Sequence, residues 1–411
     1  PTSERFAAAK PLEPVNELIE KAKRIGAEVA AKHAADVDAK ARFPQETIDA
    51  LRKEKLLSAF VPKEFGGRGA TLTEIAGICF ALGQHCATSA MVYAMHQIQV
   101  AVIVRHGQSS ESSDPPEAGR GAREFFRKYM VEMSEKELLI ASATTELGPS
   151  GNTRMSSCAV ELLPGDGGEF KLEKNAPVIS YGEHADAILI TSRKSPEAAT
   201  SDQVITLIRK GEYTLEKTGT WDTIGMRGTC SNGFMLRAQA HVDQIVPIPF
   251  ADVSSQTMLP FSHVVWTSLW SGIGADAMNK ARQYIRGEAR KKPGVVPPGA
   301  LRLAEAMNVY QSMRANIMDC TRDYERRMND PEALANLGFV IKMNNLKVAT
   351  TQVIVQVVGL ALGIVGIAGY KNDNKWSLGR HLRDCHGGAL MISNERIYGA
   401  NASLLCVYKD D

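Results

Sequence analysis

The feature that most constrains this fold is a change of hydrophobic period between residues 138 and 250. Short runs of β-branched and aliphatic residues, such as residues 187–191 and 204–208, alternate there with turns rich in Gly, Asn and Asp, a pattern typical of antiparallel β-structure. On both sides of this stretch the apolar residues recur every three to four positions, which predicts helices. The sequence therefore predicts an α+β multidomain fold in which a middle antiparallel β-barrel separates two helical parts.

We expect three domains from these changes of pattern, because 411 residues are too many for one ordinary core. The N-terminal helical domain covers residues 1–137, the middle β-barrel domain residues 138–250, and the C-terminal helical bundle residues 251–411. Trp266 and Trp270 belong to an apolar stripe at helical spacing in the bundle. Such a stripe indicates core packing rather than the wall of a ligand site.

Charge and cysteine content exclude several classes of protein. The 48 Lys and Arg residues balance 46 Asp and Glu residues without a block of like charge, which argues against a nucleic-acid or membrane-surface protein. The seven cysteines are scattered and form no Cys-x-x-Cys pair, which excludes a disulfide framework and a cysteine zinc site. No His, Asp or Glu set has metal spacing. We expect a cytoplasmic protein without a signal peptide, since charges run through its first forty residues.

One uncharged stretch has the length of a membrane span. Residues 348–370 contain no charged residue, and a membrane helix needs about 20 apolar residues. However, threonines and glutamines crowd the first half of the stretch and four glycines its second half. We therefore expect a helix that is buried on all sides within a bundle or a subunit interface, and no contact with a membrane.

Polar turns stand at the ends of the β-patterned runs. They are residues 143–153 (ATTELGPSGNT), 178–182 (VISYG) and 221–231 (WDTIGMRGTCS). Hydroxyls and glycines at strand ends let backbone N–H groups approach a flat, polar heterocycle closely. No lysine follows the glycines, as one would in a phosphate loop. The turns therefore predict a flavin-type ring as the ligand rather than a phosphate.

Six short motifs make the chain resemble the acyl-CoA dehydrogenase family from about Ala30 to Tyr398. They are residues 62–69 (PKEFGGRG), 144–152 (TTELGPSGN), 179–180 (IS), 225–231 (GMRGTCS), 366–370 (GIAGY) and 382–384 (LRD). Each motif alone is weak, but six in the family's order are a strong signal. The resemblance implies an N-terminal helical domain, a middle β-barrel and a C-terminal four-helix bundle, assembled as a homotetramer or a homodimer.

The resemblance also implies an FAD cofactor that is held partly across subunits. The cofactor-binding residues that it implies are Thr144, Thr145, Gly151, Asn152, Ile179, Ser180, Gly366 and Gly369. Thr145 would bond the pyrimidine edge of the flavin, and Ser180 would donate a hydrogen bond near flavin N5. The Gly-Asn pair of the first loop would lie between flavin and substrate. The last two glycines would let the backbone of a neighbouring subunit approach the FAD pyrophosphate.

The chain departs from the family pattern at several positions near the cofactor. Val178 stands where the family usually has a tryptophan behind the flavin. Gly363 and Ile367 stand in place of a glutamine and a glycine of the subunit-spanning motif, and residues 289–294 replace an Arg-x-x-Phe-Gly element. Most of these departures concern the adenine side of the cofactor rather than its ring.

The activity that the resemblance implies is α,β-dehydrogenation of an acyl thioester, on CoA or a carrier protein, with hydride transfer to flavin N5. Electrons would then pass to electron-transfer flavoprotein or a similar acceptor. The family's base usually lies eight residues after the aspartate of the Arg-Asp element. Counting from Asp384 leads to Ile392, which cannot accept a proton, and an alternative family position near Trp266 also lacks a carboxylate. The nearest acid, Glu395, is the predicted catalytic base, provided that an insertion of two or three residues near Gly387 brings it into place. The alternative, in which Glu395 is a solvated surface charge, stays open.

Two alternatives to the dehydrogenase remain open. The first is a flavin monooxygenase of the same fold, in which His386 or His381 after or near the Arg-Asp element would act on the substrate. The second is a homologue without a base that works only through subunit contacts. His96 could face a substrate tunnel, but we expect a hydrogen-bonded core residue. Glu146 and Arg227 are expected to order their own turns.

Overall fold

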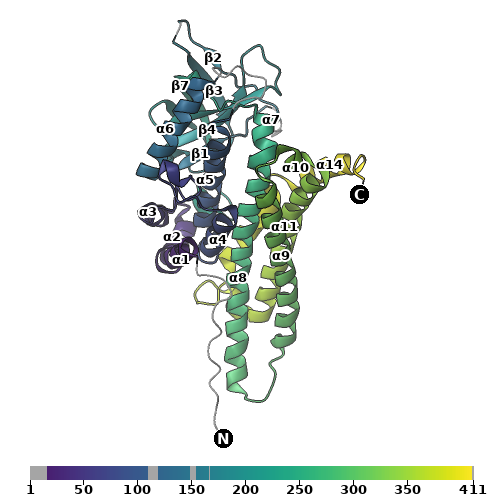
Figure 1. The fold of residues 1–411 in the computed structure, drawn as a ribbon. Helices are drawn as coiled ribbons and strands as arrows, with labels where there is room; N and C mark the ends of the chain where they lie inside the picture. The colour runs from purple at the N-terminus through teal and green to yellow at the C-terminus, as the bar shows by residue number, and fades with distance from the viewer. Residues whose placement is uncertain (1–15, 110–118, 149–153, 166, 410–411) are drawn as a thin grey trace.

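Helices occupy both ends of the chain and strands occupy its middle, in the order expected from the sequence (Figure 1). The computed structural model describes residues 16–109, 119–148, 154–165 and 167–409. The described strands lie between Ile140 and His241. One cluster of buried side chains runs from the N-terminal helices through the sheets into the C-terminal helices. Because this core is shared, it does not mark the boundaries of the three predicted domains, and these boundaries remain a prediction.

The N-terminal part is a group of helices around one central helix. Its helices are α1 (Glu17–Ile25), α2 (Ala31–Lys40), α3 (Gln45–Lys53), α4 (Leu72–Gly83), α5 (Ala87–His106) and α6 (Arg120–Lys136). Helix α4 starts at a capping box, in which the Thr71 side chain accepts the Glu74 N–H and the Glu74 carboxylate accepts the Thr71 N–H. Helix α5 is buried on nearly every side because α4, α8 and β1 cover it.

Seven described strands form two sheets. The first sheet has the order β1 (Ile140–Ala143), β4 (Ala187–Arg193), β5 (Gln203–Arg209), and the second the order β2 (Glu161–Leu162), β3 (Glu169–Ala176), β7 (Gly233–His241), β6 (Tyr213–Gly219). Strand β1 pairs in parallel with β4, with Ala141 opposite Ile188, and the other pairs are antiparallel.

The predicted antiparallel barrel is not confirmed, because the two sheets are not closed into one. The parallel pair also departs from the prediction: β2 and β3 enter the other sheet between β1 and β4, so no hairpin joins this pair. Strands β4 and β5 are buried on both faces. Leu189 packs with Phe126 and Tyr129 of α6, whereas Ile188 belongs to the main core with Leu172. The first sheet is therefore a middle layer.

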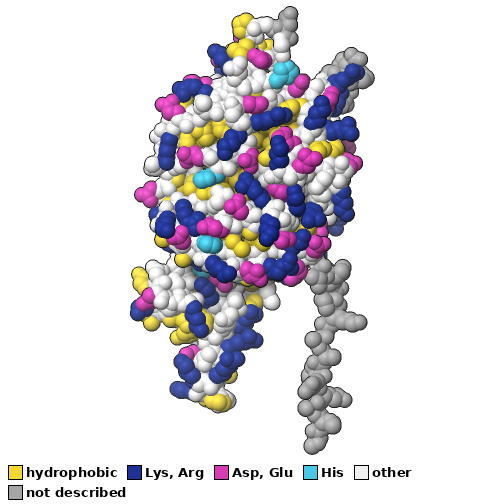
Figure 2. Space-filling model, turned by 90° about the vertical axis from the view of Figure 1, so that its left-hand side faces the viewer, with side chains coloured by type: hydrophobic (Ala, Val, Ile, Leu, Met, Phe, Trp, Pro, Cys, Tyr) yellow, Lys and Arg dark blue, Asp and Glu magenta, His cyan; other side chains and the backbone are white. Residues whose placement is uncertain are grey.

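Helices make up the described C-terminal part. They are α7 (Phe250–Val253), α8 (Leu259–Lys291), α9 (Gly299–Arg327), α10 (Pro331–Ala335), α11 (Leu337–Val365), α12 (Ile367–Tyr370), α13 (Gly379–Leu390) and α14 (Asn394–Leu405), and α8, α9 and α11 are the long ones. Helices α8, α9 and α11 pack against one another, and α13 lies against α8 and α11. The hairpin of α8 and α9 extends beyond the N-terminal helices (Figure 1). Figure 2 shows basic and acidic side chains interspersed over one face of the molecule.

Among the described residues, helices α5 and α11 are long and apolar enough to cross a membrane by length and composition alone. In the molecule the most apolar window of α5 is 89% buried, and that of α11 is 50% buried. Helix α5 is therefore a core helix. The uncharged stretch from residue 348 was expected to be buried on all sides within a bundle or a subunit interface. Within one chain, only half of the apolar window of α11 is buried.

Candidate functional site

The three polar turns lie at one edge of the sheets. The Leu147 N–H, in the turn after β1, donates to the Asn175 carbonyl near the end of β3 at 3.0 Å. The next turn carries Ser180 and lies against the turn that precedes β7. There the Ile179 N–H donates to the Asn232 carbonyl at 2.9 Å, and the Tyr181 N–H to the Thr229 carbonyl at 2.8 Å.

A chain of hydroxyl groups links the second and third turns. Ser180 Oγ and Ser231 Oγ lie 2.8 Å apart, and Ser231 Oγ lies 2.8 Å from Thr229 Oγ1. Thr229 Oγ1 in turn donates to the Met226 carbonyl at 2.9 Å. Met226 has a φ of 50° and Cys230 a φ of 48°, a left-handed conformation that non-glycine residues adopt only where the surroundings hold it. The backbone that carries the hydroxyl chain is therefore held in this conformation by the residues packed around it.

The turn after β1 is held by a buried ion pair. Glu146 accepts hydrogen bonds from the N–H of Cys158 at 2.9 Å and from the side chains of Ser156 and Ser157. Its carboxylate lies 3.7 Å from Nζ of Lys174, which is itself fully buried. Burial opposes ionisation of Glu146, but these hydrogen bonds and Lys174 lower its pKa below the usual value. The expectation that Glu146 orders its turn through backbone N–H groups is confirmed.

Thr144 and Thr145, predicted to touch the flavin, are half-buried at this edge. The Thr144 side chain lies 2.8 Å from Ser142 Oγ, and its carbonyl accepts from Thr191 Oγ1 at 3.2 Å. Gly151 and Asn152, the other predicted residues of this loop, lie outside the described residues. The structure thus brings the first turn and Ser180 to the same edge and leaves their role in binding a prediction.

Helix α13 closes one side of the third turn. The carboxylate of Asp384 accepts the Met226 N–H at 2.8 Å, and a Cβ at Gly225 would lie 2.3 Å from the Arg383 carbonyl. Burial raises the pKa of Asp384 to about 6. Arg227 donates to the carbonyls of Asp38 and of Thr223, at 2.9 and 2.7 Å. Arg227 therefore orders its own turn, as expected.

The histidines singled out in the sequence have different surroundings. His96 is fully buried, with Nε2 2.9 Å from the Leu57 carbonyl and Nδ1 accepting the Ile140 N–H at 3.1 Å, and burial lowers its pKa to about 4. His96 is the hydrogen-bonded core residue that was expected. His381 Nε2 lies 2.7 Å from a carboxylate oxygen of Asp276, between α13 and α8. His386 is exposed on α13.

The predicted base Glu395 is exposed in the first turn of α14. Between α13 and α14 the chain makes a turn at Ile392, whose φ is 45°. The side chain of Lys347, from α11, is fully buried beneath this turn and donates to the Ile392 carbonyl and to Asn394 Oδ1. Sequence reasoning missed Lys347. The available signal was a lysine one position before a long uncharged stretch.

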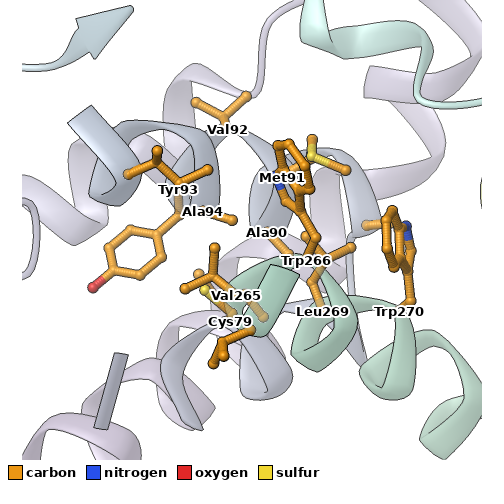
Figure 3. Packing of buried hydrophobic residues seen from close by; sticks show 14 of the residues in the cluster. Cys79, Ala90, Met91, Val92, Tyr93, Ala94, Val265, Trp266, Leu269 and Trp270 are labelled. Carbon is orange, nitrogen blue, oxygen red and sulfur yellow. The ribbon is translucent and has the colours of Figure 1, made fainter. Parts of the chain in front are cut away.

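Trp266 and Trp270 are buried, as their helical stripe predicted. Figure 3 shows Trp266 with Leu269 on α8, facing Ala90 and Met91 of α5. Both indole N–H groups lack a hydrogen-bond partner among the described residues. Buried indole N–H groups usually find a hydrogen-bond partner. These two N–H groups of α8 are therefore unsatisfied donors in the single chain.

Gly366 and Gly369, predicted to face a neighbouring subunit's cofactor, lie where α11 ends. Gly366 has a φ of 67° and open space around a would-be Cβ, whereas Gly369 is buried and its carbonyl accepts the Leu378 N–H at 2.8 Å. The neighbouring Ile367 and Tyr370 are exposed. In the part of the chain that the structure describes, no group of three or more His, Cys, Asp or Glu side chains could hold a metal ion.

Comparison with known sequences finds relatives whose names include acyl-CoA dehydrogenases and other enzymes of CoA thioesters. The family model described as the N-terminal domain of acyl-CoA dehydrogenase matches residues 13–114. Cyclohex-1-ene-1-carbonyl-CoA dehydrogenase of Syntrophus aciditrophicus is 24% identical over 275 residues, which are 66% of this chain and 62% of the relative. The short-chain-specific acyl-CoA dehydrogenase of Clostridium acetobutylicum is 22% identical over 260 residues, 62% of this chain and 63% of the relative.

A shorter match joins this chain to 3-sulfinopropanoyl-CoA desulfinase of Paraburkholderia xenovorans, with 28% identity over 96 residues, 23% of this chain and 25% of the relative. The chain thus spans from a quarter to about three fifths of the length of these curated relatives.

Comparison with solved structures gives matches along nearly the whole chain. FMN-bound TdsC from Paenibacillus sp. A11-2 has a TM-score of 0.80 and 16% identity, covering 96% of this chain and 98% of that one. Methanesulfinate monooxygenase MsuC from Pseudomonas fluorescens has a TM-score of 0.77 and 17% identity, covering 95% and 96%. At such low identity the likeness establishes the fold alone.

Proposed function

Because the chain has the fold of the acyl-CoA dehydrogenase family, we propose that it is a flavin-dependent oxidoreductase whose ring site lies where the three turns meet. The observation that carries this proposal is the hydroxyl chain from Ser180 through Ser231 to Thr229. When bound, the flavin supplies the electron transfer. Ser180 and Thr145 would hold and orient the ring through hydrogen bonds from their side chains.

We further propose FAD as the cofactor and an assembly of two or four copies. The uncovered half of α11 and the exposed Ile367 and Tyr370 beside Gly366 support a second copy at this face. Light scattering on the purified protein tests the assembly, and a monomer at micromolar concentration would contradict it. Titration with FMN and with FAD, followed by flavin fluorescence, tests which flavin binds more tightly. Cytoplasmic location and an electron-transfer flavoprotein partner are part of the same proposal.

For the reaction, the first candidate is α,β-dehydrogenation of an acyl thioester. The names of the curated relatives support it, since they include dehydrogenases of CoA thioesters. This reaction needs a base for the α-proton, and Glu395 is the candidate. Glu395 is exposed on α14 within one chain. To act as the base it must therefore be shielded from water by the bound substrate or by a second copy of the chain.

The second candidate is a flavin monooxygenase, and one observation favours it. The turn at residues 391–393, where the resemblance puts the base, contains Met, Ile and Ser, and a buried cation, Lys347, lies beneath it. A cation there lowers the proton affinity of any nearby base, whereas oxygenation does not require an enzyme carboxylate at this point. The solved structures named above include a monooxygenase. Within one chain the geometry therefore favours oxygenation.

One experiment separates the candidates. The flavin-loaded protein is titrated anaerobically with butyryl-, octanoyl- and benzoyl-CoA, and the visible absorbance is followed. Bleaching that Glu395→Gln slows by two or more orders of magnitude supports the dehydrogenase. No bleaching, together with oxygen uptake driven by chemically reduced flavin and a small aromatic or sulfur substrate, supports the monooxygenase. A protein that takes up neither FMN nor FAD would refute both.

A further inference from the structure

Lys347 is a buried cation that has no carboxylate partner among the residues that the structure describes. Its side chain is fully buried, and Nζ donates to the Ile392 carbonyl at 2.8 Å and to Asn394 Oδ1 at 2.7 Å. Asn394 Nδ2 donates in turn to Thr351 Oγ1 at 3.1 Å. Each of these partners is a neutral oxygen. Three segments, α11, the α13–α14 turn and the start of α14, are thus joined at one ammonium group. The titratable group near Lys347 from α8 is His263, whose pKa is lowered to about 4 by burial and, to a smaller extent, by the charge of Lys347.

Stability alone does not explain a lysine at this place. Moving an ammonium from water into the protein interior costs several kcal/mol, on the order of the stability of a domain, unless a counter-charge offsets it. Burial accordingly lowers the pKa of Lys347 to about 8. A methionine or leucine would fill the same volume without this cost. What the lysine adds is two directed hydrogen bonds to the turn.

The turn that it holds is strained. Ile392 has a φ of 45°, and a β-branched residue in this conformation is an outlier that persists only when its surroundings impose it. Its carbonyl is the acceptor for Lys347. Strain of this kind, of the order of 1–3 kcal/mol, gathers at functional sites.

Short contacts connect the turn to the hydroxyl chain through α13. At Gly388 a Cβ would lie 2.8 Å from Thr351 Cγ2 and 3.1 Å from Cε2 of Trp270, so only glycine lets α13 approach α8 and α11 this closely. One residue earlier, Gly387 faces Met226, whose N–H is bound by Asp384. The twelve-residue helix α13 therefore links the Lys347 turn to the flavin turn.

We infer that Lys347 is a positioning residue, which fixes the α13–α14 turn so that this turn closes the flavin site on the side of α13. The inference rests on the flavin-dependent function proposed above. Lys347 acts through the turn and does not touch the reacting atoms. Its loss is expected to change the reactivity of the bound flavin more than the stability of the protein.

The test compares Lys347→Met, Lys347→Arg and, as a matched control, Lys128→Met, which changes an exposed lysine of α6. Each protein is loaded with flavin and reduced by light, and its reoxidation by dissolved oxygen is followed from pH 6 to 10. We expect Lys347→Met to keep its flavin affinity within about threefold and to change the reoxidation rate at least tenfold. Its profile should lack an inflection near pH 8 that wild type has. Arginine should restore most of the rate and move the inflection out of range, and the control should match wild type.

The outcomes separate this inference from the proposed function. Wild type that binds no flavin would remove both. Flavin bound normally, with Lys347→Met matching wild type in rate and in pH profile, would remove the role of Lys347 alone. Should Lys347→Met fail to fold, Asn394→Ala takes its place, because it removes one of the two acceptors and leaves Lys347 on the Ile392 carbonyl. A rate unchanged in Asn394→Ala then counts against the inference as well.

Discussion

Two of the lysines that the structure describes are fully buried, and their surroundings differ in charge. Lys174, in β3, lies 3.7 Å from Glu146 and donates to the carbonyl and hydroxyl of Thr191. Lys347, in α11, donates to a carbonyl and to an amide oxygen, and has no carboxylate partner among the described residues. The charge of Lys174 is balanced by the Glu146 carboxylate, and this pair joins the loop after β1 to the sheet. The second keeps an uncompensated charge under a strained turn.

The difference teaches which buried charge is structural. A compensated pair resists the loss of either member, because the partner would be left charged in the interior. An uncompensated cation can be replaced by an apolar side chain at little cost in stability, so its retention points to function. The two lysines can therefore be told apart by whether their removal affects folding or flavin reactivity.

Lys174→Met should give the largest effect on stability, a loss of about 3–5 kcal/mol, because it strands the Glu146 carboxylate. Chemical denaturation measures it. The double variant Lys174→Met, Glu146→Gln should recover at least half of the loss, and Lys347→Met alone should cost about 1 kcal/mol or less. If Lys347→Met proved as destabilising as Lys174→Met, the contrast between the two lysines would be gone.

Asp384→Asn should alter the pH dependence of stability. Burial raises the pKa of Asp384 to about 6 in the folded protein, so its contribution to the free energy of unfolding is full below the unfolded pKa near 4 and is lost as pH rises through 6. The difference between wild type and variant should therefore shift by about 3 kcal/mol between pH 3.5 and 7, in favour of the variant at high pH. A difference independent of pH would show that Asp384 titrates normally.

Ser231→Ala should weaken flavin binding by about 1 kcal/mol, or about fivefold in Kd, because it interrupts the hydroxyl chain between Ser180 and Thr229. Fluorescence titration measures the Kd. The matched control is Thr206→Ala, whose hydroxyl bonds the Ile190 carbonyl inside the first sheet and should leave the Kd unchanged. Equal effects of the two variants would argue for general loosening of the β region.

Glu395→Gln should have the smallest effect on stability, a change in Tm of about 1 °C or less, because the carboxylate is exposed on α14. Differential scanning calorimetry measures it. A larger fall would mean that Glu395 is covered in the assembled protein, which would favour its role as the base.

The sequence predicted the order of helical and β segments because hydrophobic period reports local structure. Closure of the sheets was beyond its reach. The apolar runs at β4 and β5 fit a barrel wall equally well, and only packing shows that α6 covers one face of a middle layer. The parallel pairing of β1 with β4 depends on where β2 and β3 go, which no local pattern reports.

For the site, the sequence located the turns and the roles of Glu146 and Arg227, because each of these side chains bonds to a residue near it in the chain. The role of His96 followed from its place on an apolar helical face, which predicts a hydrogen-bonded core residue whatever its partners are. Lys347 escaped notice since its partners lie 45 and 47 residues away. A contact of this range needs the three-dimensional arrangement. The base faced the same difficulty: counting from Asp384 ended at Ile392, and only the structure shows what occupies that turn.

Helix α5 has a consequence for how the protein matures. Its sides are covered by α4 from its own part, by β1 from the sheets and by α8 from the C-terminal part. During synthesis, one side of this apolar helix therefore stays uncovered until α8, which begins at Leu259, has been made. The N-terminal helices therefore reach their final packing only after the C-terminal part has been synthesised, and their apolar surface needs protection from aggregation until then.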